Sequence, residues 1–178
     1  MKPPISVRSN GVRLLMVAAG VAILALSSRA QVPMEPVPFT LQTLAVLLSG
    51  MLFGWRLGLL IVIAWLAAGA AGLPVFAGGL GGWQRFLGPT GGYLGAFPVA
   101  AAAAGWLVER GWNGRRPVHA CAAALIGHAV CLLPGTLWLS TFVGRNEAVA
   151  NGLLPFIPGA ILKSVAAVAV LMLVGRRK

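Results

Sequence analysis

Acidic side chains are almost absent from this sequence. Aspartate does not occur in its 178 residues, and the acidic positions are Glu35, Glu109 and Glu147. None of these glutamates lies in the middle of a long apolar run, where an ionisable side chain would mark a functional site. This distribution argues against a carboxylate proton relay and against an intramembrane aspartyl protease.

Cysteine and histidine are also scarce. Cys121 and Cys131 both lie inside an apolar run, which does not indicate a disulfide scaffold. His128 could share a helical face with both cysteines, but a metal or haem site would need further ligands from elsewhere. The remaining histidine is His119. We therefore expect no metal and no other cofactor.

A phosphate-binding loop is missing as well. The run GGLGG at 78–82 is not followed by the Gly-Lys-Ser/Thr of a P-loop. Within the apolar runs we find no nucleophile, metal-ligand set or pair of acids that would suit a membrane enzyme. We expect the chain not to be an enzyme, and any ATP-driven step would depend on a partner.

Hydrophobic residues make up 58% of the chain and charged residues only 10%, with a mean hydropathy of +0.88. A soluble domain carries about 25% charged residues, so this chain lies far outside that class. The net charge of +11 does not indicate nucleic-acid binding, because the basic residues lie at the ends of apolar runs. The pattern predicts a polytopic membrane protein.

The fold class that we predict is all-α, with six transmembrane helices in a single membrane domain over residues 1–178. Residues 1–11 would form a short basic cytoplasmic tail. The second span is short for a bilayer, which takes about 20 residues when crossed at right angles. The six predicted spans are Leu14–Leu26, Thr40–Phe53, Leu57–Gly72, Thr90–Val108, Val118–Phe142 and Pro158–Val174.

The first apolar run has two interpretations. A basic start, an apolar middle and the small-residue site at 28–30 are typical of a cleaved signal peptide. Alternatively the run is a retained first helix, in which Ala18 and Ala22 form a small-xxx-small face suited to helix contact. We favour the retained helix, although alanine is abundant throughout the chain.

The distribution of lysine and arginine predicts that both termini are cytoplasmic. The outer side would then carry only Arg29, Arg85 and Arg145, in the connections 29–39, 73–89 and 143–157. These three connections are rich in proline and glycine, so a site open to the exterior follows. The cytoplasmic set is Lys2, Arg8, Arg13, Arg56, Arg110, Arg115, Arg116, Arg176, Arg177 and Lys178.

The stretch Leu73–Tyr93, LPVFAGGLGGWQRFLGPTGGY, is the most unusual connection. Its glycines let a ligand approach the main chain closely. Phe76 and Trp83 supply apolar walls, and Arg85 supplies a charged donor fork. This composition favours a small ligand that is partly apolar and partly anionic.

Lys163 is the most informative single residue, because it lies inside the last predicted span. A lysine within a membrane helix costs about 2.5–3.5 kcal/mol on insertion scales, so it normally faces a cavity or a partner. Pro158 is suited to the first helical position, which would place Lys163 about one turn inside the helix. Lys163 and Arg85 together could hold one carboxylate, or Lys163 could instead extend to the outer interface.

Two neutral polar residues have equally open interpretations. Gln42, one turn into the second span, could bind an amide-like ligand group or form an interhelical hydrogen bond. Tyr93, the one tyrosine of the chain, could contact the ligand or anchor the helix at the interface.

Five segments resemble the BioY family of biotin transporters, over about residues 12–175. They are VPFTLQTLAVLLSGMLFGWRLG (37–58), GLPVFAGG (72–79), GPTGGYLGAF (88–97), GTLWL (135–139) and PFIPGAILK (155–163). The resemblance implies the substrate-binding S component of an energy-coupling factor (ECF) transporter in the cell membrane, which takes up biotin from the outer face. It also implies that Ala18 and Ala22 dock a transmembrane coupling subunit, driven by two ATPases. Some family members are thought to act without that unit, and an S component for another small vitamin is the alternative.

One position departs from the family pattern, which resembles Pro-Gly-Asp before the lysine. This chain has Ala160 where the resemblance implies an aspartate that accepts the ureido N–H groups of biotin. Gln42, Asn151 or backbone carbonyls would have to replace it. The biotin-binding residues that we expect are Gln42, Phe76, Gly79, Trp83, Arg85, Tyr93, Asn151 and Lys163.

Overall fold

The computed structural model describes residues 9–175, and all but the last residues of the predicted basic tail lie outside that range. Lys2, Arg8, Arg176, Arg177 and Lys178, which entered the prediction of topology, also lie outside it. The helices are α1 (Asn10–Arg29), α2 (Gln42–Phe53), α3 (Trp55–Ala70), η1 (Ala77–Gly79), α4 (Gln84–Leu87), α5 (Gly91–Glu109), α6 (Pro117–Val143), α7 (Arg145–Gly152) and α8 (Phe156–Gly175). Two short strands, β1 (Gln31–Val32) and β2 (Phe39–Thr40), complete the fold.

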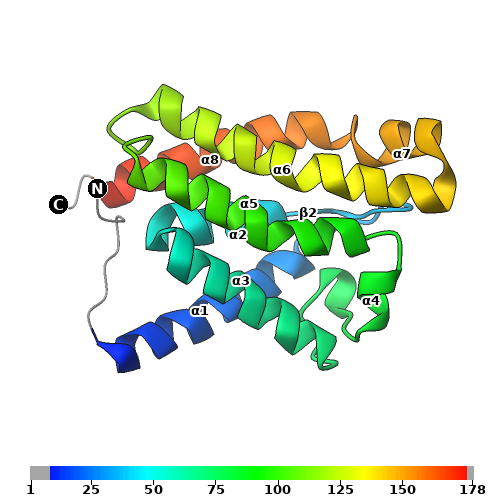
Figure 1. Cartoon of the computed structure of the whole chain (residues 1–178), viewed down its shortest axis with the longest axis horizontal. Coiled ribbons are helices and arrows are strands. Elements are labelled where there is room, and N and C mark those ends of the chain that lie inside the picture. The colour runs from blue at the N-terminus through cyan, green and yellow to red at the C-terminus, as the bar shows by residue number, and fades with distance from the viewer. Residues whose placement is uncertain (1–8, 176–178) are drawn as a thin grey trace.

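The long helices form a bundle in which α5 lies at the centre and packs against α6, α2 and α3 (Figure 1). The α1 helix covers α3, and α8 packs against α6 on the opposite side of the bundle. The α2 and α5 backbones approach closely at two glycines. A Cβ at Gly50 would collide with the carbonyl of Ala101, and a Cβ at Gly105 would lie 2.6 Å from the Gly50 carbonyl oxygen.

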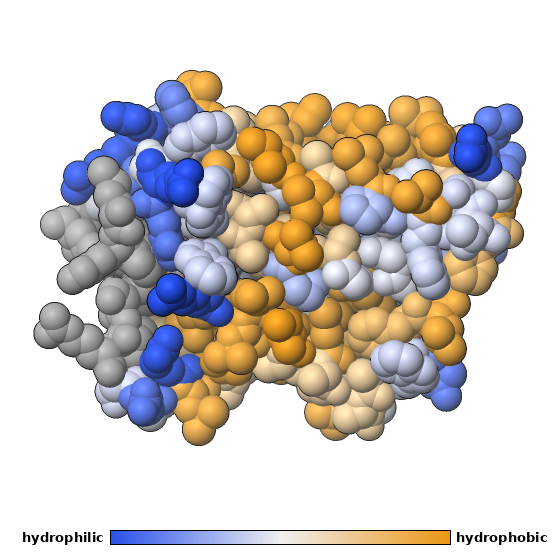
Figure 2. All heavy atoms as spheres, in the orientation of Figure 1, coloured by the Kyte–Doolittle hydropathy of each residue, from blue (hydrophilic) through white to orange (hydrophobic). Residues whose placement is uncertain are grey.

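The surface has the character of a multi-pass membrane protein. On the face shown in Figure 2, an apolar band crosses the middle of the molecule and hydrophilic side chains gather at its two ends. Four segments within residues 9–175 are long and apolar enough to cross a membrane, namely Asn10–Arg29, Gly91–Glu109, Pro117–Val143 and Arg145–Gly175. The α2 and α3 helices are apolar but shorter. The all-α membrane fold is therefore confirmed, whereas the number of spans stays a prediction.

The basic residues of the described chain follow the predicted division. The start of α1, the α2–α3 turn, the α5–α6 connection and the end of α8 all lie at the left of Figure 1. These segments carry Arg13, Arg56, Arg110, Arg115 and Arg116, all exposed. The hairpin, α4 and α7 lie toward the other end (Figure 1). We call the end that carries the exposed arginines the basic end, and the end that carries the hairpin, α4 and α7 the hairpin end.

The three connections at the hairpin end hold more structure than we expected. The connection that follows α1 contains β1 and β2, which pair as an antiparallel hairpin that places Gln31 opposite Thr40. The connection 73–89 contains η1 and α4, and 143–157 contains α7. The α8 helix begins at Phe156 rather than Pro158, so Lys163 lies about two turns inside it and not one.

Candidate functional site

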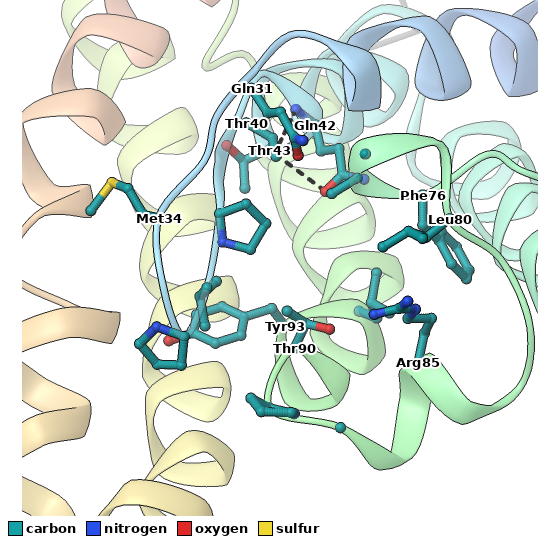
Figure 3. Close-up of a pocket in the computed structure, with 18 of the residues that line it drawn as sticks. Gln31, Met34, Thr40, Gln42, Thr43, Phe76, Leu80, Arg85, Thr90 and Tyr93 are labelled. Carbon is teal, nitrogen blue, oxygen red and sulfur yellow. Dashed lines mark hydrogen bonds between the residues drawn. The ribbon is translucent and has the colours of Figure 1, made fainter.

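A cavity of about 800 Å³ opens at the hairpin end. Its walls come from the β1–β2 hairpin and the start of α2, from the glycine-rich connection with α4, and from α5, α6 and α8 (Figure 3). A cavity of this size, with apolar walls and a few polar groups, is typical of a site for a small organic molecule. Segments far apart in the sequence therefore enclose one ligand-sized space.

Gln42 belongs to a buried hydrogen-bond network on the hairpin wall. Its backbone N–H donates to Thr40 Oγ1 over 3.2 Å, and the Thr40 hydroxyl donates to Gln42 Oε1 over 3.2 Å (Figure 3). Gln42 Nε2 donates to Ser28 Oγ over 2.8 Å, and Ser28 donates to the carbonyl of Leu24. Gln42 thus makes the interhelical hydrogen bond that joins α2 to α1 and also lines the cavity, while its contact with a ligand stays a prediction.

Lys163 joins α8 to the same wall. Its ammonium donates to the Thr40 carbonyl oxygen over 2.6 Å and to Thr43 Oγ1 over 3.0 Å. The ammonium also lies 4.2 Å from the centre of the Phe39 ring, within cation–π range. Lys163 is 7% exposed and lines the cavity, so it does not extend to the outer interface. These contacts leave its third N–H for a ligand.

Aromatic rings form the apolar part of the lining. Phe76 is buried and makes an edge-to-face contact with Trp65, with ring centres 5.2 Å apart. Trp65 Nε1 donates to the Val75 carbonyl over 3.0 Å, which holds the connection against α3. Phe97 and Phe156 also line the cavity. Flat rings of this kind can pack on both faces of a small ring system.

Tyr93 presents its ring to the cavity and not a free hydroxyl. The hydroxyl donates to the Gly152 carbonyl over 2.8 Å and lies 3.4 Å from Thr136 Oγ1. These bonds tie α5 to α6 and to the end of α7. Tyr93 is therefore both part of the lining and an anchor between helices.

Arg85 lies on α4, across the cavity from the hairpin (Figure 3). Its side chain is exposed, and within residues 9–175 the guanidinium has no hydrogen-bonding partner. An arginine at the open side of a cavity can bind a carboxylate with two parallel hydrogen bonds. The two cations that we predicted thus line one cavity, at different walls.

Three predicted ligand residues do not line the cavity. Gly79 faces the guanidinium of Arg29, and an added Cβ would lie 3.1 Å from Arg29 Cζ. Trp83 is 59% exposed and stacks on Phe86 outside the lining. Asn151 donates to Glu147 Oε2 over 2.7 Å, along its own short helix. These three residues are close in sequence to residues of the lining, but the local structure of the two connections places them outside it.

Sequence reasoning missed several lining residues on and beside the hairpin, namely Gln31, Met34, Thr40 and Thr43. We expected residues 29–39 to be only an extended connection. The pairing of Gln31 with Thr40 was not visible in the sequence, because strands of two residues have no detectable alternation. The prolines Pro33, Pro36 and Pro38 were the available signal for a rigid loop over the site.

The remaining predicted positions lie outside the cavity lining. Ala18 and Ala22 are exposed on α1, together with Leu15 and Leu26. The deeper face of α1 is part of the core, where Leu24 has no exposed surface. Ala160 is 7% exposed and does not line the cavity. Within the described residues no group of three or more metal-ligating side chains occurs.

Comparisons with known proteins agree over nearly the whole chain. A family model described as "BioY family" matches residues 1–178. A probable biotin transporter BioY from Pyrococcus horikoshii is 42% identical over 155 residues, which cover 87% of this chain and 91% of the relative. The biotin transporter BioY from Thermotoga maritima is 34% identical over 159 residues, covering 85% and 90%. A crystal structure of the S component for biotin from an ECF-type ABC transporter superposes with a TM-score of 0.86 at 27% identity, covering 97% of this chain and 96% of that one.

Proposed function

The chain belongs to the BioY family, and we propose that it is a biotin-binding S component that takes up biotin together with an ECF-type coupling unit. The observation that carries this proposal is the composition of the cavity. One wall is a buried polar network, the sides are aromatic, and an arginine lies at the exposed side. Biotin carries matching groups in the same order along its length, namely a polar ureido ring, an apolar sulfur-containing ring and chain, and a carboxylate.

We propose that the ureido ring lies against the hairpin wall. Lys163 and Gln42 are held there by fixed partners, so their remaining N–H groups can donate to the ureido carbonyl without reorganising. Phe76 and the ring of Tyr93 pack on the fused rings. The carboxylate then extends to Arg85, where part of its hydration is kept and less desolvation is required.

We propose that the cavity opens to the exterior and that the basic end is cytoplasmic. Lysine and arginine are enriched on the cytoplasmic side of membrane proteins, and the exposed arginines at the basic end fit that rule. Reporter fusions to the two termini of the full chain test this orientation. A C-terminal reporter on the outside would contradict it, and an N-terminal tag lost during biogenesis would favour the signal peptide.

We propose that the exposed face of α1 docks the coupling subunit. Ala18 and Ala22 lie one turn apart on a helix that the rest of the bundle leaves largely uncovered. Small residues let two helix backbones approach closely, which is how helices associate in membranes. We also propose that ATPase subunits drive the coupling unit and that the complex lies in the plasma membrane.

Ligand-induced thermal stabilisation of the purified chain tests the choice of vitamin. A ligand at about 100 times its Kd stabilises the folded state by about 2.7 kcal/mol. We expect biotin to raise the unfolding temperature, while thiamine and riboflavin leave it unchanged. Stabilisation by another vitamin and not by biotin would replace this proposal with the alternative substrate.

A further inference from the structure

Gln31 carries the one buried side-chain acceptor of the cavity wall that has no partner in the described part of the chain. Its Oε1 atom is shielded from solvent and accepts no hydrogen bond. Gln31 nevertheless lines the cavity, at the end of the hairpin next to α1. A buried amide oxygen without a partner is unfavourable, so its presence at a ligand cavity calls for a donor.

The position of Gln31 is fixed by strand pairing. Gln31 and Thr40 are opposite each other in the β1–β2 hairpin, and side chains of directly paired residues lie on the same face. Leu41 N–H donates to the Ala30 carbonyl over 3.0 Å, which extends this pairing by one residue. Figure 3 shows Gln31 near Thr40 and Gln42 at one wall of the cavity.

The glycine-rich connection confines the Gln31 amide from the other side. An added Cβ at Gly78 would lie 3.3 Å from Gln31 Nε2, so the absence of a side chain there leaves space for the amide. Arg29 holds the same connection next to β1, because its Nη2 lies 3.4 Å from the Pro74 carbonyl oxygen. The amide is therefore placed between two backbone segments before any ligand binds.

Within residues 9–175 no neighbouring polar group donates to Gln31 Oε1. The Thr40 hydroxyl donates to Gln42 Oε1, and the Lys163 ammonium donates to Thr40 and Thr43. Among the buried groups of this wall, Lys163 and Gln42 therefore have N–H groups left to donate, and Gln31 Oε1 is an acceptor without a donor. A group with a carbonyl flanked by N–H matches that combination.

We propose that Gln31 Oε1 accepts a hydrogen bond from a ureido N–H of biotin, which rests on the proposed function. Ala160 has no side-chain acceptor and does not line the cavity, so the acceptor comes from the hairpin rather than from this position of α8. Gln31 is then a specificity-determining residue that distinguishes a ring N–H from a ring oxygen at this position. If a ring oxygen replaced this N–H, the ring oxygen and Gln31 Oε1 would be two acceptors facing each other, with no hydrogen between them to form a bond.

The test uses the full chain, biotin, and two biotin analogues in which one or the other ureido N–H is replaced by a ring oxygen. The wild type should bind one of the two analogues roughly tenfold more weakly than biotin. Gln31→Met should weaken biotin by roughly threefold to tenfold and bind that analogue within about twofold of biotin. Gln31→Glu keeps the acceptor and the length of the side chain, so it should retain the preference for biotin.

Two further measurements separate this role from a structural one. Gln31→Met removes an unpartnered buried amide, so the unfolding temperature without ligand should be unchanged or raised. Val32→Met, on the neighbouring exposed position of β1, should change neither affinity nor preference. An equal loss of affinity for biotin and both analogues in Gln31→Met, or no loss at all, would overturn the role of Gln31. A wild type that binds no biotin would instead overturn the proposed function.

Discussion

The ammonium of Lys163 lies 2.6 Å from the carbonyl oxygen of Thr40, which joins α8 to the hairpin across 123 positions of the sequence. Both residues are only 7% exposed. Lys163 thus holds the buried polar wall of the cavity in place, while the other cation of the lining, Arg85, is exposed on α4. The two cations have different surroundings, so they should serve different parts of one ligand.

Replacing Lys163 with methionine should weaken biotin by roughly tenfold to hundredfold, because a charge-assisted hydrogen bond contributes about 1.5–3 kcal/mol. The uncharged amide of biotin should weaken by the same factor, since the ammonium serves the ring and not the carboxylate. Isothermal titration with both ligands checks this. A much smaller loss for the amide would assign the carboxylate to Lys163, the role that its sequence position first suggested.

The sequence was sufficient for the parts of the fold that follow from hydrophobic runs. Long apolar stretches ended by arginine or glycine favour helices in a membrane, so α1, α2, α3, α5, α6 and α8 were predictable to within a few residues. The cavity residues Gln42, Phe76, Arg85, Tyr93 and Lys163 were found because polar or aromatic side chains stand out at span ends. Lys163 in particular has no reason to lie in a span unless it faces a cavity or a partner.

The rest depended on packing that no local pattern encodes. The β1–β2 pairing sets which side chains of residues 31–40 face the cavity, and two-residue strands leave no periodic signal. Trp83 resembled a cavity residue by composition, yet the four-residue helix α4 presents Arg85 to the cavity and leaves Trp83 exposed. Asn151 paired with Glu147 because residues 145–152 are helical, which places positions four apart on one face.

Replacing Tyr93 with phenylalanine should lower stability and leave biotin affinity nearly unchanged. The hydroxyl is engaged by the Gly152 carbonyl, so its loss should cost about 1 kcal/mol of unfolding free energy. The ring that packs on the ligand is kept. Tyr93→Leu removes the flat ring and should weaken biotin as well. Thermal unfolding and biotin titration of the two variants separate these effects, and a large affinity loss in Tyr93→Phe would mean that the hydroxyl itself contacts the ligand.

Replacing Ala18 and Ala22 together with leucine should block docking of the coupling subunit and leave biotin binding intact. Two leucines would keep the helix backbones apart, because close approach requires small residues at the contact. Ala129 is an exposed alanine on α6, so Ala129→Leu is a matched control that should leave docking unchanged. Co-purification of the complex measures docking, and titration of the isolated chain measures binding. Equal loss of both would make this face part of the internal packing, and unchanged uptake would show that no partner is needed there.

Replacing Arg85 with methionine should weaken biotin and spare its amide, the reverse of the selectivity expected for Lys163. Arg85 has no partner within residues 9–175, so its guanidinium is free to pair with the valerate carboxylate. Because the side chain is exposed, water and salt screen the pair, and we expect a loss of roughly twofold to fivefold. Arg145 is also exposed but lies on α7 outside the cavity lining, so Arg145→Met controls for a change in net charge.

Salt dependence gives this last prediction a second readout. Raising the ionic strength from about 0.01 M to about 1 M shortens the Debye length from about 30 Å to about 3 Å. The affinity difference between wild type and Arg85→Met should shrink over that range, whereas the difference for the buried Lys163→Met should change little. If the Arg85→Met difference does not depend on salt, the guanidinium acts through packing of the cavity wall. If Arg85→Met weakens biotin and the amide alike, the carboxylate lies elsewhere, and Lys163 becomes its only other cationic candidate in the lining.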